Sequence, residues 1–237
     1  MTAPTSTEAL ARAVSSLVRE HDVTDVLQRL LADAIEALEA RAGGLLLVAD
    51  GGGLELLAAT SHAATELELL QVQEHTGPCW EAVTGGEVVQ VAGHDDLVAR
   101  WPDIGRAMLE AGYESVTAYP LHWRDEVLGA MNVFHGTDAP ATGDEVDVLG
   151  PAFADIATLV IVTPHELSSK TLQRRTHEAL SGRTVIEQAK GVIAFREGVD
   201  VAVAYDRLVA TARDRGVSLT DMARVVLAST APGAARY

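Results

Sequence analysis

The sequence predicts an α+β fold, in which an antiparallel sheet with packed helices spans residues 1–165 and an all-α bundle of three helices spans residues 183–237. Apolar runs that pair around turn residues are found in the first part, and this pattern is typical of β-hairpins. Beyond Pro164, which would disrupt a helix running through it, apolar residues recur at helical spacing. We expect residues 166–182 to form a helical linker, compatible with a coiled coil.

The elements of the first part follow from changes in apolar spacing. A wide apolar stripe from Val26 to Leu38 predicts a helix that packs on a sheet or on a partner subunit. The remaining elements expected in this part are strands over Gly44–Ala49 and Leu54–Thr60, short helices over Ala64–Val72 and Cys79–Val83, a strand over Val88–Val91, a helix over Asp96–Ala111, a hairpin of Glu114–His122 with Val127–His135, and a helix ending near Thr163.

Three amphipathic helices are expected in the last part of the chain. Their inward positions are Ile186, Ala189, Val192 and Ile193, then Ala204, Tyr205 and Leu208, and finally Leu219, Met222, Ala223, Val226 and Leu227. Asp200 is expected to cap the middle helix, and Ser218-x-x-Asp221 to begin the last one.

Composition narrows the class of protein. Hydrophobic residues make up 48% of the 237 residues and charged residues 22%, which is typical of a globular protein. The first residues lack the features of a signal peptide, and no apolar run approaches the roughly 20 residues that span a bilayer. Cys79 is the only cysteine, which excludes an intrachain disulfide and a four-cysteine zinc site. We expect a cytoplasmic protein with no membrane partner.

The sequence carries no recognisable catalytic constellation. The histidines are scattered without the spacing of metal ligands, and no phosphate-binding glycine motif occurs. We therefore expect neither an enzyme nor a metal site. The only cofactor we expect is an unidentified small molecule bound by the first domain.

Charge divides the chain into two unequal parts. Residues 1–165 hold 7 Lys and Arg against 26 Asp and Glu, a net charge of −19, whereas residues 166–237 hold 11 against 8, a net charge of +3. The first part should repel polyanions, and the second could tolerate one.

Four short motifs in the first part resemble the GAF domains of actinobacterial regulators. They are Gly77-Pro78-Cys79-Trp80-Glu81-Ala82, Trp101-Pro102, Tyr119-Pro120-Leu121 and Leu128-Gly129-Ala130-Met131-Asn132. The resemblance implies a sensor domain that holds an unidentified small molecule against its sheet. Its expected lining is Cys79, Trp80, Trp101, Met108, Tyr119, Trp123 and Met131. The alternative is that these residues pack the core, as large apolar residues usually do.

A second resemblance covers the last part. Arg183-Thr-Val-Ile186-Glu-Gln-Ala189-Lys190-Gly191, Ala204-Tyr205-x-x-Leu208 and Leu219-Thr-Asp221-Met222-Ala223-x-x-Val226 resemble the ANTAR domain. The resemblance implies a homodimeric transcription antitermination regulator that binds paired RNA stem-loops in leader transcripts, with no DNA partner. The near-heptad spacing of Leu167, Leu172, Thr176 and Leu180 also favours a dimer.

The candidate RNA-binding residues are Arg183, Lys190, Gly191, Arg196, Arg207, Arg213 and Arg215. Lys190 is expected on the side of its helix opposite the apolar positions, although surface cations are often simply solvated. The chain departs from the family at three positions, where Val209 replaces a common Arg, Ala212 a polar residue and Gly216 an Asn. The alternative function is therefore a ligand- or redox-sensing regulator that acts through protein contacts, with RNA binding weakened or lost.

Overall fold

The computed structural model describes residues 10–12, 14, 15, 23–136, 146–162 and 169–229, with only the backbone path given for residues 146, 147 and 169–181. Pro164, Leu167 and the side chains of Leu172, Thr176 and Leu180 lie outside this description. The helices and strands are α2 (Val23–Ala37), β1 (Ala42–Val48), β2 (Leu54–Ala59), α3 (His62–Glu74), α4 (Pro78–Gly85), β3 (Val89–Ala92), α5 (His94–Arg100), α6 (Pro102–Glu110), β4 (Ser115–Trp123), β5 (Glu126–His135), α7 (Val146–Val162), α8 (Ser169–Glu197), α9 (Val201–Arg215) and α10 (Leu219–Ala228).

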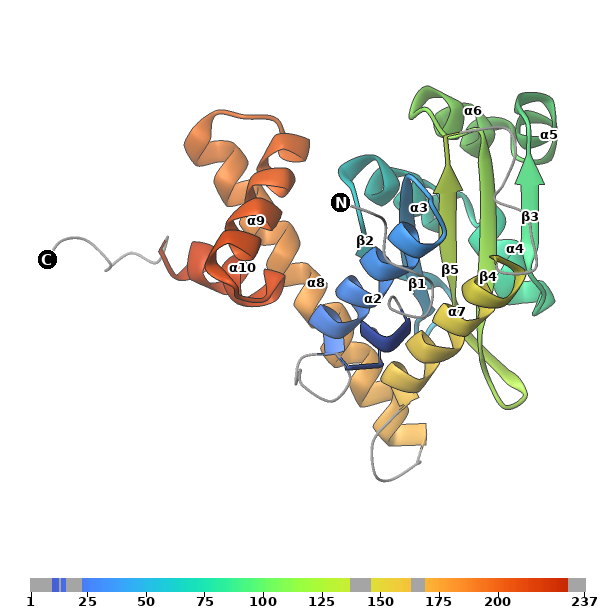
Figure 1. The fold of residues 1–237 in the computed structure, drawn as a ribbon, viewed down its shortest axis with the longest axis horizontal. Helices are drawn as coiled ribbons and strands as arrows, with labels where there is room; N and C mark the ends of the chain where they lie inside the picture. Colours follow the sequence, from blue (N-terminus) through green and yellow to red (C-terminus); the bar gives the residue numbers. More distant parts are fainter. Residues whose placement is uncertain (1–9, 13, 16–22, 137–145, 163–168, 230–237) are drawn as a thin grey trace, which may run out of the picture.

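The first domain is built on a five-stranded antiparallel sheet with the strand order β2-β1-β5-β4-β3. Both hairpins predicted from the sequence, β1–β2 and β4–β5, are present. Figure 1 shows α2 and α7 crossing one face of the sheet, and the α8–α10 bundle lying beyond the β2 edge. The predicted fold class, an α+β domain followed by an all-α bundle, is confirmed.

Side chains that alternate along the strands form two separate cores. Tyr119 and Met131 belong to the core beneath α2 and α7. Val116 and Ala130 belong to the opposite core, beneath α3 to α6. Because successive strand residues point to opposite faces, neighbours in sequence belong to different cores.

One predicted helix is in fact two. The sequence predicts a single helix over Asp96–Ala111, whereas the structure has α5 and α6 with a break at Trp101. Pro102 is the reason, because proline lacks an N–H and suits the first turn of a helix, where no donor is needed. The break leaves the Trp101 ring 1% exposed in the core.

The linker and the first helix of the bundle are continuous. Helix α8 runs for 29 residues from Ser169 to Glu197, so the described part of the predicted linker, residues 169–182, is helical and continues into the bundle. The predicted caps of the following helices are present. Asp200 accepts a hydrogen bond from the Ala202 N–H at 2.8 Å, and Ser218 accepts one from the Asp221 N–H at 2.9 Å. The bundle core contains the predicted Ile186, Ala189, Ile193, Ala204, Tyr205, Leu208, Met222 and Ala223.

Candidate functional site

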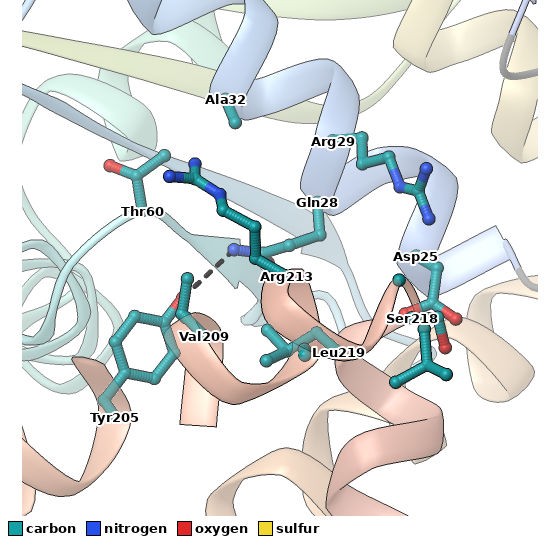
Figure 2. A pocket seen from close by; sticks show the side chains of 13 residues that line it. Asp25, Gln28, Arg29, Ala32, Thr60, Tyr205, Val209, Arg213, Ser218 and Leu219 are labelled. Carbon is teal, nitrogen blue, oxygen red and sulfur yellow. Dashed lines mark hydrogen bonds between the residues drawn. The ribbon is translucent and has the colours of Figure 1, made fainter. Parts of the chain in front are cut away.

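The two domains are joined by hydrogen bonds around one backbone carbonyl at the end of β2. The Tyr205 hydroxyl of α9 donates to the Ala59 carbonyl oxygen at 2.9 Å. The Gln28 amide of α2 donates to the same oxygen at 2.8 Å. It also donates to the Tyr205 hydroxyl at 3.1 Å (Figure 2). Tyr205 is 6% exposed, so its hydroxyl exchanges water for these partners when the bundle docks. We call this arrangement the docked state.

A second contact caps a helix across the domain boundary. The first N–H groups of a helix have no partner within it, and Asp25 of α2 accepts from the Thr220 N–H of α10 at 3.1 Å. Asp25 is 5% exposed. A carboxylate at a helix N-terminus is also stabilised by the helix dipole. Nearby, Gly182 of α8 lies so close to Thr24 that a Cβ atom would overlap the Thr24 side chain.

The structure corrects the predicted position of Lys190. Its side chain is 1% exposed, and its ammonium group donates to the two Glu187 carboxylate oxygens at 3.1 and 3.0 Å. The ammonium nitrogen also lies 5.2 Å from the centroid of the Tyr205 ring. Because α8 packs against both the bundle and the first domain, its buried face is wider than the amphipathic pattern indicates. Lys190 supports Tyr205 and is not available to RNA in the docked state.

Arg183 is also drawn into the domain boundary. Burial lowers the pKa of its guanidinium, while the carboxylates of Glu187 and Glu55 oppose that shift. Glu55 belongs to β2 of the first domain. Arg183 therefore faces acidic groups of the protein on the side where the domains meet.

The other candidate cations are dispersed over the bundle. Arg196 donates to the Ser229 hydroxyl and carbonyl oxygens at 2.8 and 2.7 Å, and Arg207 forms an ion pair with Glu197. The side chains of Arg213 and Arg215 are exposed and form no hydrogen bond or ion pair with any residue that the structure describes. Arg213 faces α2 across a pocket. The predicted residues thus do not form one cationic surface.

Gly191 lies on the outer side of α8. No atom lies within 4 Å of the position that a Cβ atom would take, so the glycine is not required for helix packing. Phe195, one turn further along α8, is 90% exposed. Phe195 was not among the RNA-binding residues predicted from the sequence, although it is an aromatic residue next to Arg196.

The expected ligand-lining residues of the first domain do not surround one cavity. Cys79, Trp101 and Met108 are buried in the core beneath α3 to α6, where Trp80 packs beside them. Tyr119 and Met131 lie on the other face of the sheet. Trp123 is half-buried at the end of β4, with the Arg124 guanidinium 5.3 Å from its ring centroid. Tyr119 and Met131 are therefore placed wrongly in a common lining with Cys79.

A buried polar cluster fills the space between α3, α4 and β5. Glu68 accepts hydrogen bonds from the Asn132 amide at 2.9 Å on both oxygens and from the Gln71 amide at 2.7 Å. The Gln71 carbonyl accepts from the Cys79 N–H at 3.1 Å. All four residues are fully buried. Burial raises the pKa of Glu68 to about 8, so this carboxyl is mostly protonated near neutral pH.

The same cluster bears on the redox alternative. Burial, and then the nearby Glu68, raise the pKa of the Cys79 thiol well above its usual value. A sensor cysteine needs an exposed thiolate, so the geometry disfavours redox sensing at Cys79. Sequence reasoning missed Glu68 and Asn132. The available signal was Gly44, since a Cβ atom there would overlap the Glu68 side chain.

The chain thus has two domains, an antiparallel-sheet domain and a helical bundle that is docked on it. Residues 20–160 match the GAF domain family model and residues 174–227 match the ANTAR domain family model. The chain belongs to the GAF domain family and carries a C-terminal ANTAR domain. No curated protein matches the chain. Within the residues described, no helix is both long and apolar enough to cross a membrane.

Solved structures share the fold of the first domain. The GAF domain of an Acinetobacter phosphoenolpyruvate-protein phosphotransferase is 16% identical, with a TM-score of 0.53 over 65% of this chain and 90% of that chain. The corresponding GAF domain from Coxiella burnetii is 18% identical, with a TM-score of 0.53 over 68% of this chain and 95% of that chain. The reduced form of fRMsr of Staphylococcus aureus is 18% identical, with a TM-score of 0.51 over 68% of this chain and 99% of that chain.

Glu68 should make stability depend on pH. Its pKa rises from 4.5 in the unfolded chain to about 8 in the fold, so the unfolded chain loses this proton first as the pH rises. The free energy of unfolding should therefore fall between these two values, by up to about 1.4 kcal/mol per pH unit. Glu68→Gln keeps the acceptor for Asn132 without titrating and should remove this fall, as measured by urea unfolding from about pH 5 to pH 8. In the control variant Glu74→Gln, at an exposed residue, the free energy of unfolding should fall with pH as in the wild type. An equal fall in Glu68→Gln would argue against a protonated Glu68.

Gly182→Ala should undock the bundle. The added methyl overlaps Thr24, whereas elsewhere in a helix the same change stabilises by about 0.5–1 kcal/mol. Hydrogen exchange of the Thr220 amide reports docking, because Asp25 of the other domain is its acceptor. We expect this amide to exchange about ten-fold faster or more in Gly182→Ala. The matched control, Gly191→Ala, meets open space on the same helix, and faster exchange there too would mean that helix stability alone controls the amide.

Proposed function

We propose that this protein is an RNA-binding transcription antitermination regulator whose ANTAR bundle is controlled by its GAF sensor domain, and that it acts by binding and not by catalysis. The observation that carries the proposal is the ANTAR match over residues 174–227, in the part of the chain with a net charge of +3. The expected partners are stem-loops in leader transcripts, with neither DNA nor a membrane involved, and the expected location is the cytoplasm.

The outer side of α8 is the surface best suited to an unpaired RNA base. Phe195 is 90% exposed, and exposed aromatic rings are platforms on which loop bases stack. Gly191 leaves the helix backbone bare one turn earlier, so a base or sugar can approach closely. Phe195 and Gly191 together offer a flat apolar contact without displacing any packed side chain.

Arg196 supplies the charge beside this platform. Its two terminal nitrogens are oriented by the Ser229 hydroxyl and carbonyl oxygens. A guanidinium has five N–H donors, so donors remain for a phosphate. Because the hydrogen bonds to Ser229 restrict the side chain, less rotamer entropy is lost when a phosphate binds.

The docked state is proposed to be the state of low RNA affinity. It holds Lys190 and Arg183 at or near the domain boundary, among carboxylates of the protein. It also fixes the bundle beside a domain whose net charge over residues 1–165 is −19, which repels phosphates. Release of the bundle would separate Arg183 from Glu55 of β2 and would move the bundle away from this negative charge.

A homodimer would present two bundles to paired stem-loops. Helix α7 exposes Val148 and Leu159, with 66% and 48% of each residue accessible. Ala152 and Ile156 continue the same stripe and are half-buried, so a second copy of this helix would find an apolar surface. Once one stem-loop is bound, the second bundle meets the other at a raised effective concentration.

The second candidate function is a sensor that acts through protein contacts, with RNA binding lost. It is favoured by the burial of Lys190 and by the Arg207–Glu197 ion pair, which reduce the cations that remain free. Selection from a pool of randomised tandem stem-loop RNAs separates the two. An RNA whose log affinity falls with log salt supports the regulator, and no retained RNA at low salt supports the second function.

Phe195→Ala should weaken binding of the selected RNA without changing its salt dependence. Stacking on an aromatic ring contributes about 1–3 kcal/mol per base, which corresponds to a loss of roughly five- to a hundred-fold in affinity. Arg196→Gln should instead reduce the salt slope by about one contact. The control is Val225→Ala, at an apolar residue of α10 that is 52% exposed. Equal losses in Phe195→Ala and Val225→Ala would remove Phe195 from the RNA site.

A further inference from the structure

A pocket of about 540 Å³ lies between the two domains, and we call it the interdomain pocket. One side is formed by α2 and the end of β2, including Gln28 and Thr60, and the other by α9 and the loop before α10 (Figure 2). Small molecules occupy pockets of roughly 300–1,000 Å³. Because both domains supply walls, this pocket exists only in the docked state.

The lining of the pocket combines apolar side chains with the guanidinium of Arg213, which has no partner among the described residues. Val209 and Leu219 are apolar, and the Tyr205 hydroxyl lies between the two sides. Figure 2 shows the Arg213 side chain extending toward the side of the pocket where Thr60 and Ala32 lie. The Arg213 guanidinium forms no hydrogen bond or ion pair with any residue that the structure describes.

The charges around the pocket favour an anion. Arg213 supplies a positive charge to the lining, whereas the second lining arginine, Arg29, already interacts with the Asp33 carboxyl; the one carboxylate in the lining is Asp25. One oxygen of that carboxylate already accepts from the Thr220 N–H. A guanidinium binds carboxylate or phosphoryl oxygens through two parallel hydrogen bonds.

The three positions at which this chain departs from the ANTAR motif all line the interdomain pocket. They are Val209, Ala212 and Gly216. An Arg side chain at position 209 would fill part of this space and place a further cation in it. The positions at which this chain departs from the motif therefore face the first domain across this pocket.

We propose that the interdomain pocket binds a small organic anion, with its apolar body against Val209 and Leu219 and its anionic group on Arg213. A ligand that contacts both domains binds the docked state alone, so it stabilises that state. Its consequence for RNA rests on the function proposed above, in which the docked state has low RNA affinity.

The test uses the full chain and two fluorescent probes that share one apolar body. Anilinonaphthalene sulfonate carries an anionic group, and N-phenylnaphthylamine is its neutral counterpart. We expect the anion to bind at one site, and Arg213→Gln to weaken it about ten-fold while changing the neutral probe little. Arg215→Gln is the matched control, because Arg215 lies two residues away on α9 and outside the pocket.

A second variant tests whether the anion binds in the interdomain pocket, because it fills that pocket with a larger side chain. Ala32 is exposed on α2 and lines the pocket, so Ala32→Phe should fill the space without disturbing a core and should abolish binding of the anion. Equal binding of the anion to the wild type, Arg213→Gln and Ala32→Phe would overturn the proposal, as would no binding to the wild type.

The effect on RNA is read separately. The anion should weaken binding of the selected RNA about five-fold in the wild type and leave it unchanged in Ala32→Phe. Arg213-dependent binding of the anion without any RNA binding would uphold the pocket and overturn the RNA function. RNA binding without Arg213-dependent binding of the anion would overturn the pocket alone.

Discussion

The Ala59 carbonyl at the end of β2 is the point on which the arrangement of the two domains depends. It accepts hydrogen bonds from both the Tyr205 hydroxyl and the Gln28 amide. The Tyr205 ring meanwhile packs in the core of the bundle. Tyr205 links the two domains, since its ring packs in the bundle core and its hydroxyl lies at the domain boundary. This link favours the docked state because a buried hydroxyl without hydrogen-bond partners costs free energy.

Electrostatics reinforce this linkage. The Lys190 ammonium lies over the Tyr205 ring and pairs with Glu187, so the positive charge that the sequence predicted at the surface is used here inside the protein. Removing one partner of such a buried pair leaves an uncompensated charge. Phe195 and Arg196 are thus exposed on the bundle, whereas Lys190 is buried and Arg183 lies at the domain boundary.

Much of the fold could be predicted from the sequence, and its long-range contacts could not. Apolar periodicity and turn residues locate the two hairpins, the bundle core and the caps at Asp200 and Ser218, because these depend on residues a few positions apart. The burial of Lys190 depends on a second surface packed against α8, which a helical pattern in one segment does not reveal. The Asp25–Thr220 and Tyr205–Ala59 contacts join residues far apart in sequence.

The ligand-lining prediction failed for a related reason. The residues were chosen for their size and motif, whereas strand alternation decides which face each one occupies, and Tyr119 and Met131 point to the face opposite Cys79. The polar cluster of Glu68 and Asn132 was missed because a charged residue in a helix is usually solvated. Here glycine at position 44 leaves the space that the carboxyl fills.

Electron–electron distance measurement between spin labels on the two domains tests the docked state most directly. Labels at Glu66→Cys on α3 and Ala210→Cys on α9 sit on exposed positions, and the native Cys79 is buried. Dilution with unlabelled protein removes distances between copies. The account predicts one narrow distance population in the free protein, which broadens or shifts when the selected RNA binds. A broad population in the free protein would show that the sensor domain does not hold the bundle.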